Sequence, residues 1–463
     1  MKITTLSVLT AIALSATSAS ALTLYTDPAT GQVFTTAGDG RVQMGDFIDA
    51  KTVYEENQAQ DSAAMKKELA KKESKITIMR KDSPEFLLGQ ETDINMKFVP
   101  EDNKDMWLKA GVRIQGSFEG VNTDYNDASK SDESTQDAYL RRVRFEVAAG
   151  FGKHSSFVMD VRNDKANYRD EGENEFNVGD AYVKIKKPFD TSLLNFKLYR
   201  AKIDVSRTET VKSARVIAYD RPKVADQAAQ YITHNRRGTN VQAYGDWEKK
   251  IHYQIASGDG VHSGKLADAK GKKDSEISES SFFYGGKIVL SPFDGWEETQ
   301  RTETYFGEGK HFSVGAAYWA TPQIKGENPS GDKFDLNNEL INLEMSAHYN
   351  GLFVQAEYFK FKDTVRDWNS GIDVDTGDSD GYYVTSEYVM KDFYYVAPFF
   401  RYEDWDKFSD EDGYDYEATT VGVNWYLRGN TTKVGLYYQT EDYGKNIGDK
   451  DVDTIRLTSQ WFF

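Results

Sequence analysis

The chain has 463 residues, a formal net charge of −17, 28 tyrosines, 26 phenylalanines, eight tryptophans and no cysteine. Without cysteine there are no disulfide bonds and no thiol chemistry, and zinc or iron–sulfur sites are disfavoured. The strong negative charge argues against nucleic acid as a partner.

Residues 1–21 have the features of a secretory signal peptide. Lys2 precedes an apolar run from Leu6 to Leu14, and the segment closes on the small-residue pattern Ala19-Ser20-Ala21. The run is too short to cross a bilayer, and no later stretch approaches the roughly 18 apolar residues that a membrane helix needs. We therefore expect export across the inner membrane and a mature chain that starts at Leu22.

Residues 22–104 are predicted to form a helical extension in the periplasm. The stretch 25–31 is turn-rich, whereas 46–75 is rich in Ala, Glu, Lys, Gln and Met and predicts a helix. Its apolar seam has polar breaks, so a trimeric coiled coil and a solvated single helix both fit. The residues of this seam are Phe47, Ala50, Tyr54, Asn57, Asp61, Ala64 and Leu69. At about 80 residues the extension is smaller than the plug of an active transporter, which argues against energised uptake.

Residues 105–463 divide into segments in which apolar and polar residues alternate, the pattern of β-strands with one apolar and one polar face. The predicted strands are 106–120, 137–150, 154–163, 176–187, 193–204, 236–247, 249–260, 280–291, 310–321, 337–349, 351–362, 380–390, 393–405, 416–428, 430–442 and 451–463. Tight turns alternate with long polar connections, which is typical of transmembrane β-barrels with short periplasmic turns. The connection 292–309 is long for a turn and leaves the count of sixteen open by about two.

The alternation also assigns the two faces of the predicted barrel. Val421, Val423 and Trp425 would face lipid and Asn424 the lumen. On the second strand, the register that places Arg142, Arg144 and Glu146 inside is favoured, because a charge at the lipid midplane costs about 2–4 kcal/mol. Tyr139, Val143, Phe145 and Val147 would then face lipid, with Arg141 at the outer rim.

Positive charge is concentrated in one part of the predicted barrel. Residues 137–250 contain 22 Lys and Arg against 16 Asp and Glu, a net of +6 in a chain of −17. Within this part, the connection 205–235 carries an apolar run, 216–219, which predicts that it folds into the barrel and narrows the lumen. The predicted ion-pathway residues are Arg142, Arg144, Arg162, Lys184, Lys186, Lys197, Arg207, Arg215, Arg221 and Lys223.

Inward acidic residues leave an alternative open. Asp160, Asp180, Glu344, Glu357, Glu387 and Glu403 also point inward by the alternation. If they pair with the cations, the result is a mixed-charge pore of weak selectivity. If they do not, arginine forks form an anion-binding constriction.

Four short motifs carry a resemblance to a known family. Tyr139-Leu-Arg-Arg-Val-Arg144, Ser213-Ala-Arg215, Asn235-Arg-Arg-Gly238 and Val423-Asn-Trp-Tyr-Leu427 together resemble the phosphate-selective porin O and P family. The resemblance implies a sixteen-stranded trimeric porin with an inward-folded third loop and a path lined by Arg142, Arg144 and Arg215. The acidic inner residues and acidic loops depart from a strongly anion-selective pattern. The resemblance therefore leaves open whether phosphate is the preferred solute.

Other candidate sites are weaker. Asp373, Asp375, Asp378 and Asp380 form a weak calcium candidate that lacks EF-hand spacing, and an ordinary acidic outer loop fits them better. The six histidines show no ligand spacing. No cofactor is expected, and no constellation predicts an enzyme.

The sequence therefore predicts an all-β outer-membrane porin, a passive, water-filled channel for small hydrophilic solutes that favours anions such as phosphate. The expected partners are further copies in a homotrimer, outer-membrane lipid, lipopolysaccharide and small anions. The alternatives are a non-selective or cation-preferring general porin, and a structural tether between the outer membrane and the cell wall.

Overall fold

The computed structural model describes residues 22–47, 76–78, 96–100, 103, 105–166, 168, 175–233, 236–260, 276–293, 302–327, 330–370, 372–409 and 411–462. The chain forms two compact units, 1–75 and 76–463. The predicted signal peptide lies outside the described residues. So does the predicted helix over 46–75, apart from Asp46 and Phe47.

The described part of the first unit is a three-stranded antiparallel sheet in the order β2-β1-β3. Its strands are β1 (Leu22–Thr26), β2 (Val33–Phe34) and β3 (Val42–Phe47). The turn after β1 is held by Asp27, whose Oδ1 accepts a hydrogen bond from the amide of Ala29 at 2.9 Å. This part of the predicted helical extension is therefore sheet, because Thr, Tyr, Val and Phe favour strands.

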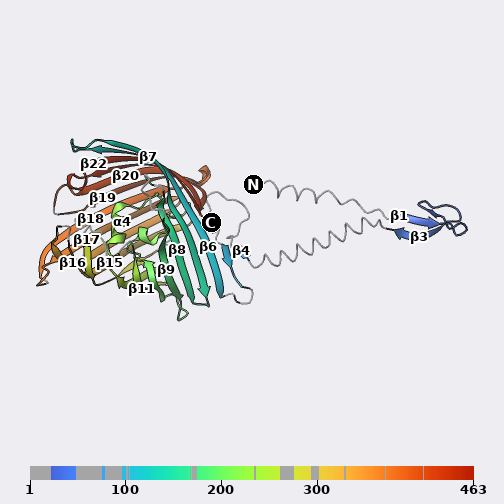
Figure 1. Ribbon diagram of the computed structural model, residues 1–463, viewed down its shortest axis with the longest axis horizontal. Coiled ribbons are helices and arrows are strands. Elements are labelled where there is room, and N and C mark those ends of the chain that lie inside the picture. The colour runs from blue at the N-terminus through green and yellow to red at the C-terminus, as the bar shows by residue number, and fades with distance from the viewer. Residues whose placement is uncertain are drawn as a thin grey trace. The chain divides into compact units, whose positions relative to one another are not determined.

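The described residues of the second unit form a closed antiparallel barrel of sixteen spanning strands, as the sequence predicts (Figure 1). The strands are β6 (Met106–Tyr125), β7 (Glu133–Phe151), β8 (Ser155–Ala166), β9 (Asn177–Lys186), β10 (Asn195–Lys202), β11 (Arg237–Trp247), β12 (Ile251–Asp259), β13 (Glu276–Ser280) with β14 (Phe282–Leu290), β15 (Lys310–Glu327), β16 (Lys333–Tyr349), β17 (Leu352–Arg366), β18 (Asp373–Tyr388), β19 (Val396–Asp406), β20 (Asp415–Asn430), β21 (Thr432–Tyr443) and β22 (Lys450–Phe462). Pairing of β22 with β6 closes the ring.

Several short elements accompany these strands. β13 and β14 count as one spanning strand, because they pair with successive parts of β15 and are separated only by Ser281. β4 (Ile76–Ile78) pairs with β5 (Met96–Phe98), and β5 pairs with the start of β6. Two 3-10 helices, η3 (Lys391–Phe393) and η4 (Lys445–Ile447), lie in connections.

The predicted faces hold over most of the barrel. Val421 and Trp425 are each 44% exposed on the outer face, whereas Asn424 between them is fully buried inside. In β22, Ile455 and Leu457 likewise point outward. The outer surface is therefore apolar and suited to lipid, with a polar inner wall.

One exception follows from a β-bulge in β7. Gln115 of β6 pairs with Arg142 and Gly116 pairs with Leu140, so Arg141 is an extra residue in β7. A one-residue shift exchanges the faces of a strand. The predictions that Tyr139 faces lipid and that Arg141 lies at the outer rim are therefore wrong, since both side chains turn inward. Tyr139 is 6% exposed and its hydroxyl donates to Glu119 at 3.1 Å.

The predicted division into tight turns and long connections holds only in part, because several strands extend into the predicted loops. β15 joins β16 through residues 328–332 and β17 joins β18 through residues 367–372. Asn350 and Gly351 join β16 to β17 with positive φ angles of 51° and 90°, which suits a two-residue hairpin turn of a twisted sheet. β14 pairs directly with β15, so no further strand lies between them in the barrel. We call the two ends of the barrel the tight-turn end and the long-connection end.

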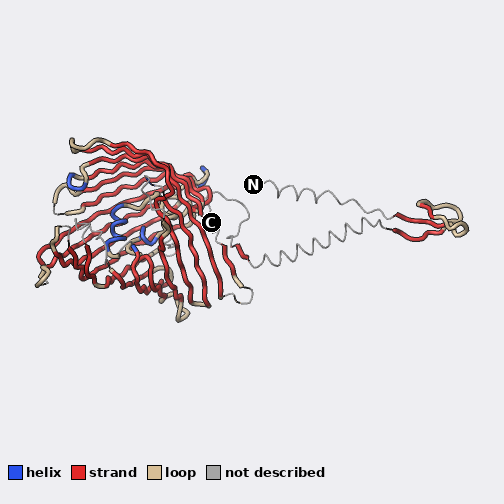
Figure 2. Tube along the Cα trace, viewed as in Figure 1, coloured by secondary structure: helices blue, strands red, loops and turns tan. Residues whose placement is uncertain are grey.

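The described residues of the connection from β10 to β11, 203–233 and 236, lie inside the ring of strands; we call them the inner segment (Figures 1 and 2). It contains α3 (Arg207–Thr210) and α4 (Lys223–Tyr231). The hydroxyl of Ser206 caps α3 by accepting a hydrogen bond from the amide of Glu209 at 3.3 Å. No helix of the described residues has the length and apolar character needed to cross a bilayer.

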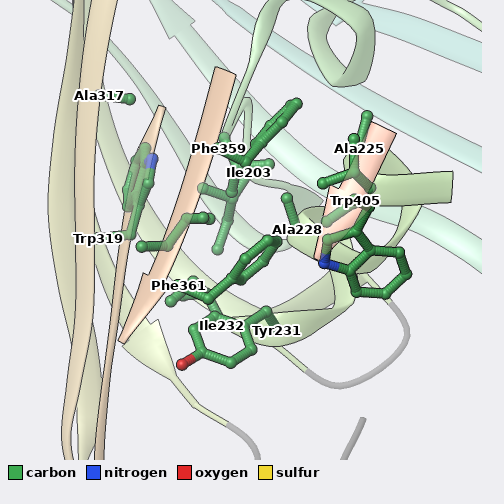
Figure 3. Packing of buried hydrophobic residues seen from close by; sticks show 14 of the residues in the cluster. Ile203, Ala225, Ala228, Tyr231, Ile232, Ala317, Trp319, Phe359, Phe361 and Trp405 are labelled. Atoms are coloured by element: carbon green, nitrogen blue, oxygen red, sulfur yellow. The ribbon is translucent and has the colours of Figure 1, made fainter. Parts of the chain in front are cut away.

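The inner segment is held against one side of the barrel by apolar packing. Ala225, Ala228 and Tyr231 of α4 pack on aromatic side chains of the inner wall, among them Phe361 and Trp405 (Figure 3). The rings of Tyr231 and Phe361 meet edge to face with their centres 5.0 Å apart. Burying each large apolar side chain is worth about 1.5–3 kcal/mol, so this contact holds the segment firmly in place.

Candidate functional site

A cavity of about 1400 Å³ lies between the inner segment and the part of the wall formed by β6 to β12. Among the described residues that line it are 18 lysines and arginines and seven aspartates and glutamates, an excess of 11 positive charges. The cavity is open to solvent and runs beside the packed segment. It is the candidate ion pathway of the barrel.

Nine of the ten predicted pathway residues line this cavity: Arg142, Arg144, Arg162, Lys184, Lys186, Lys197, Arg215, Arg221 and Lys223. Arg207 does not line it, so that prediction is wrong. Its Nε donates to Oε1 of Gln355 at 3.0 Å, and its amide donates to Glu357 at 2.9 Å, both on β17. α3 turns this side chain toward the opposite wall, where it helps to anchor the inner segment.

Sequence reasoning missed several further cations in the cavity wall: Lys109, Arg113, Arg141, Lys165, Arg200, Lys202, Lys212, Arg236 and Arg237. For Arg113 the signal was present, because the alternation along β6 places it on the same face as Gln115, which is buried inside. Arg236 and Arg237 belong to a quoted motif but were given no role. Arg141 was hidden by the bulge.

Ser213 of the inner segment joins two guanidinium groups in the middle of the cavity wall. Arg113 and Arg144 donate to its hydroxyl oxygen at 3.3 and 3.2 Å. Arg144 also pairs with Asp164 at 3.0 Å, and Arg113 with Glu146 at 2.5 Å. Two arginines of the wall therefore meet the inner segment at Ser213.

Asp220 forms a second junction, nearer the long-connection end. Its carboxylate lies 3.0 Å from Arg141, 3.4 Å from Arg142 and 3.2 Å from Arg456. Its backbone oxygen accepts a hydrogen bond from Arg401 at 2.7 Å. Burial raises the pKa of Asp220, but the three guanidinium groups outweigh burial and lower this pKa well below its ordinary value.

Glu209 forms a third junction, beneath α4. Its buried carboxylate lies 2.9 Å from Lys202, 2.9 Å from Arg236 and 3.5 Å from Arg221. Burial raises the pKa of Glu209, yet these three cations lower it far below its ordinary value. The carboxylate therefore stays ionised, and its single negative charge forms ion pairs with three cations.

Most of the inward acidic residues lie away from the pathway. Glu357 accepts hydrogen bonds from the amides of Arg207 and Thr208, at 2.9 and 2.8 Å, and Glu403 accepts one from the amide of Lys223 at 2.6 Å. Of the remaining four, two pair with other residues of the wall and two line the cavity. Glu344 pairs with Lys287 at 2.8 Å and Glu387 accepts from Tyr426 at 2.5 Å, whereas Asp160 and Asp180 line the cavity paired with Arg162 and Arg237. Of the six, two thus bind backbone amides of the inner segment, two pair with other wall residues and two line the cavity.

Acidic residues also gather on the outer face at the long-connection end. Asp404, Glu417, Asp442, Asp451 and Asp124 pair in register across five strands. The chain therefore separates its charges, with acid on the outer rim and base in the lumen. The net charge of −17 says little about the cavity.

The weak calcium candidate is not a compact loop. Asp373 to Tyr388 form β18, and strands β17 and β18 take up most of the connection expected between the predicted strands 351–362 and 380–390. Asp378 pairs with Lys360 at 3.2 Å, and Asp380 accepts a hydrogen bond from Ser409 at 2.8 Å. In the part of the chain that is described, no three His, Cys, Asp or Glu side chains are placed to hold a metal.

These observations define the class of protein. A closed sixteen-stranded barrel with an apolar outer face, a charged lumen and an inner segment beside an open cavity is an outer-membrane channel of the porin class. The family model for phosphate-selective porin O and P matches residues 108–462, and the chain belongs to this family. It is a channel protein of the outer membrane.

Solved structures share this fold at low sequence identity. An anion-selective porin from Comamonas acidovorans matches with a TM-score of 0.53 and 11% identity, over 77% of this chain and all of that one. The outer-membrane channel DcaP of Acinetobacter baumannii matches with a TM-score of 0.51 and 11% identity, over 79% of this chain and 99% of that one. Among curated protein sequences there is no match.

Proposed function

We propose that this porin passes small hydrophilic anions, phosphate among them, passively down their gradients. The observation that carries the proposal is the charge of the cavity wall, with 18 cationic and seven acidic residues. Four inward glutamates that would have opposed this field are engaged beneath the inner segment or on the far wall. The anion-selective porin from Comamonas acidovorans shares only the fold at 11% identity, so the argument rests on the cavity.

The mechanism needs no cofactor. Guanidinium groups donate two hydrogen bonds in a plane and so replace part of the water around an oxyanion. Beside protein, the effective dielectric constant is lower than in bulk water, which strengthens the attraction. A cation that already has an acidic partner holds a passing anion weakly and releases it to the next.

A planar-bilayer measurement tests the proposal. The zero-current potential across a salt gradient should have the sign of anion selectivity. It should fall when Lys184, Lys186 and Lys197 on β9 and β10 are all changed to Gln. Lys360→Gln is the control, because Lys360 pairs with Asp378 and does not line the cavity. A cationic or near-zero potential in the unchanged protein contradicts the proposal.

We also propose that the segment before the barrel lies in the periplasm and helps the chain to assemble as a homotrimer. The first strands of the second unit, β4 and β5, join β6 at its first residues, which is the tight-turn end and the periplasmic end in outer-membrane barrels. The family resemblance supports the trimer. Deleting residues 22–75 should leave conductance intact and weaken the trimer on gels. Loss of cell-wall attachment with unchanged assembly would favour a tether.

A further inference from the structure

Asp220 stands out among the acidic residues of the cavity because three arginines converge on it. Arg141 and Arg142 come from β7 and Arg456 from β22, at 3.0, 3.4 and 3.2 Å from its carboxylate oxygens. Its side chain is 35% exposed and faces the cavity. A carboxylate on the pathway thus already occupies a three-arginine site.

Contacts that do not involve this side chain also hold the inner segment in place. Around Asp220 the wall holds backbone oxygens. Arg401 donates to the oxygen of Asp220 at 2.7 Å, Asn424 to that of Ile217 at 3.1 Å and Lys433 to that of Val216 at 2.8 Å. Apolar packing of α4 adds to these contacts. The position of the inner segment therefore does not rest on the carboxylate of Asp220 alone.

The arrangement matches the chemistry that recognises a free oxyanion. Guanidinium groups hold carboxylate and phosphate oxygens by the same charge-assisted hydrogen bonds. Arg456 also forms an ion pair with Glu119 at 2.8 Å, whereas Arg141 and Arg142 form theirs with Asp220. With Asp220 in place, a passing anion meets three arginines that are already partly neutralised.

We propose that Asp220 is a specificity-determining residue that acts as a built-in counter-ion, occupying the site formed by Arg141, Arg142 and Arg456. It keeps that site weak, so that anions pass through without being held. This inference rests on the proposed anion channel. Without the carboxylate, the three arginines become a binding site for phosphate.

The test is Asp220→Asn in the full-length porin, with inorganic phosphate as the probe in planar bilayers. We expect the phosphate concentration that half-saturates conductance to fall about tenfold, because one charge-assisted acceptor no longer competes for the arginines. The anion-to-cation permeability ratio should rise as well. Asp220→Glu, which keeps the carboxylate, should saturate like the unchanged protein.

Asp204→Asn is the matched control. Asp204 also lines the cavity, but among the described residues it pairs with a single cation, Lys197, at 3.7 Å. If only the total charge mattered, both neutral variants would change saturation equally, and the inference would be overturned.

Two other results would also overturn it. One is an Asp220→Asn channel that loses anion selectivity, and the other is a variant that no longer inserts as a barrel, because either makes the carboxylate a structural anchor. An unchanged protein without anion preference would instead contradict the proposed function itself. An anion-selective protein with an unaltered Asp220→Asn variant would contradict only this inference.

Discussion

Arg141 illustrates how much a single extra residue matters in a β-strand. The alternation in the sequence assigned its neighbours correctly on one side, where Arg142 and Arg144 face the lumen. It failed on the other side, at Tyr139, because a bulge has no signature in a period-2 pattern. Residue-level prediction was therefore reliable within regular pairing and unreliable across an irregularity.

The inward position of Arg141 leads to a prediction about selectivity. Arg141→Gln should lower the anion-to-cation permeability ratio about threefold, since a unit charge a few ångströms away is worth about 1 kcal/mol or more near protein. Reversal potentials in a salt gradient measure this ratio. If the side chain lay at the lipid rim instead, the variant would conduct like the unchanged protein.

The lowered pKa values of Glu209 and Asp220 make stability depend on pH. Their folded-state pKa values lie below those of the unfolded chain, near 4. The stabilisation is therefore complete above about pH 5 and is lost as the pH falls toward the folded values. The unfolding temperature in detergent should be flat from about pH 8 to about pH 5 and then decrease. Glu209→Gln should be less stable at neutral pH and should show a shallower decrease in acid.

At the scale of elements, the sequence predicts the strands of the barrel, but it does not predict how the inner segment packs inside it. Sixteen alternating segments locate the wall, and the apolar run 216–219 predicts an inward turn of the connection that holds it. Nothing in that run indicates which part of the wall it meets, since its packing partners Phe353, Phe399 and Tyr437 are distant from it in sequence. The two short helices were not predicted, because tertiary packing defines them more than local propensity does.

A second inward element was also missed. The sequence shows only that the connection before β15 is long for a turn. In the structure, Glu303 of this connection is buried against the inner segment. The carboxylate of Glu303 accepts hydrogen bonds from the amide of Ile217 at 2.7 Å and the hydroxyl of Thr208 at 3.1 Å. Its own amide donates to the backbone oxygen of Arg215 at 3.1 Å. Two connections from different strands thus brace each other.

Removing this brace should loosen the inner segment without opening the barrel. Glu303→Ala leaves a buried amide unpaired, which costs about 1–3 kcal/mol locally. Hydrogen exchange at Ile217 should accelerate at least about tenfold, and single-channel current should become noisier. Glu308→Ala provides the control, because exposed Glu308 pairs only with Lys391 among the described contacts. Equal exchange in both variants would contradict the brace.

For the whole molecule, the separation of charge explains why composition misleads. The row Asp404, Glu417, Asp442, Asp451 and Asp124 contributes to a negative total while the lumen is positive. Like charges directly opposite one another on a sheet are destabilising. The sequence contains all of these residues, but only the strand register shows that they are neighbours.

This row predicts a salt effect on the barrel as a whole. Raising monovalent salt from about 0.01 M to about 0.15 M shortens the Debye length from about 30 to about 8 Å and screens the repulsion. The unfolding temperature in detergent should rise accordingly. The double variant Glu417→Gln, Asp451→Asn should be more stable at low salt and respond less to its addition. A steeper response in that variant would rule this account out.

Closure of the ring between β22 and β6 also constrains how the inner segment reaches the lumen. The inner segment belongs to the connection after β10, and it lies within a sheet that is sealed only when the last strand meets the first spanning strand. A sealed ring leaves no lateral gap through which this segment with its two helices could enter from the membrane. The segment must therefore enter the lumen either before the seam shuts or afterwards through the open end at which it joins β10 to β11.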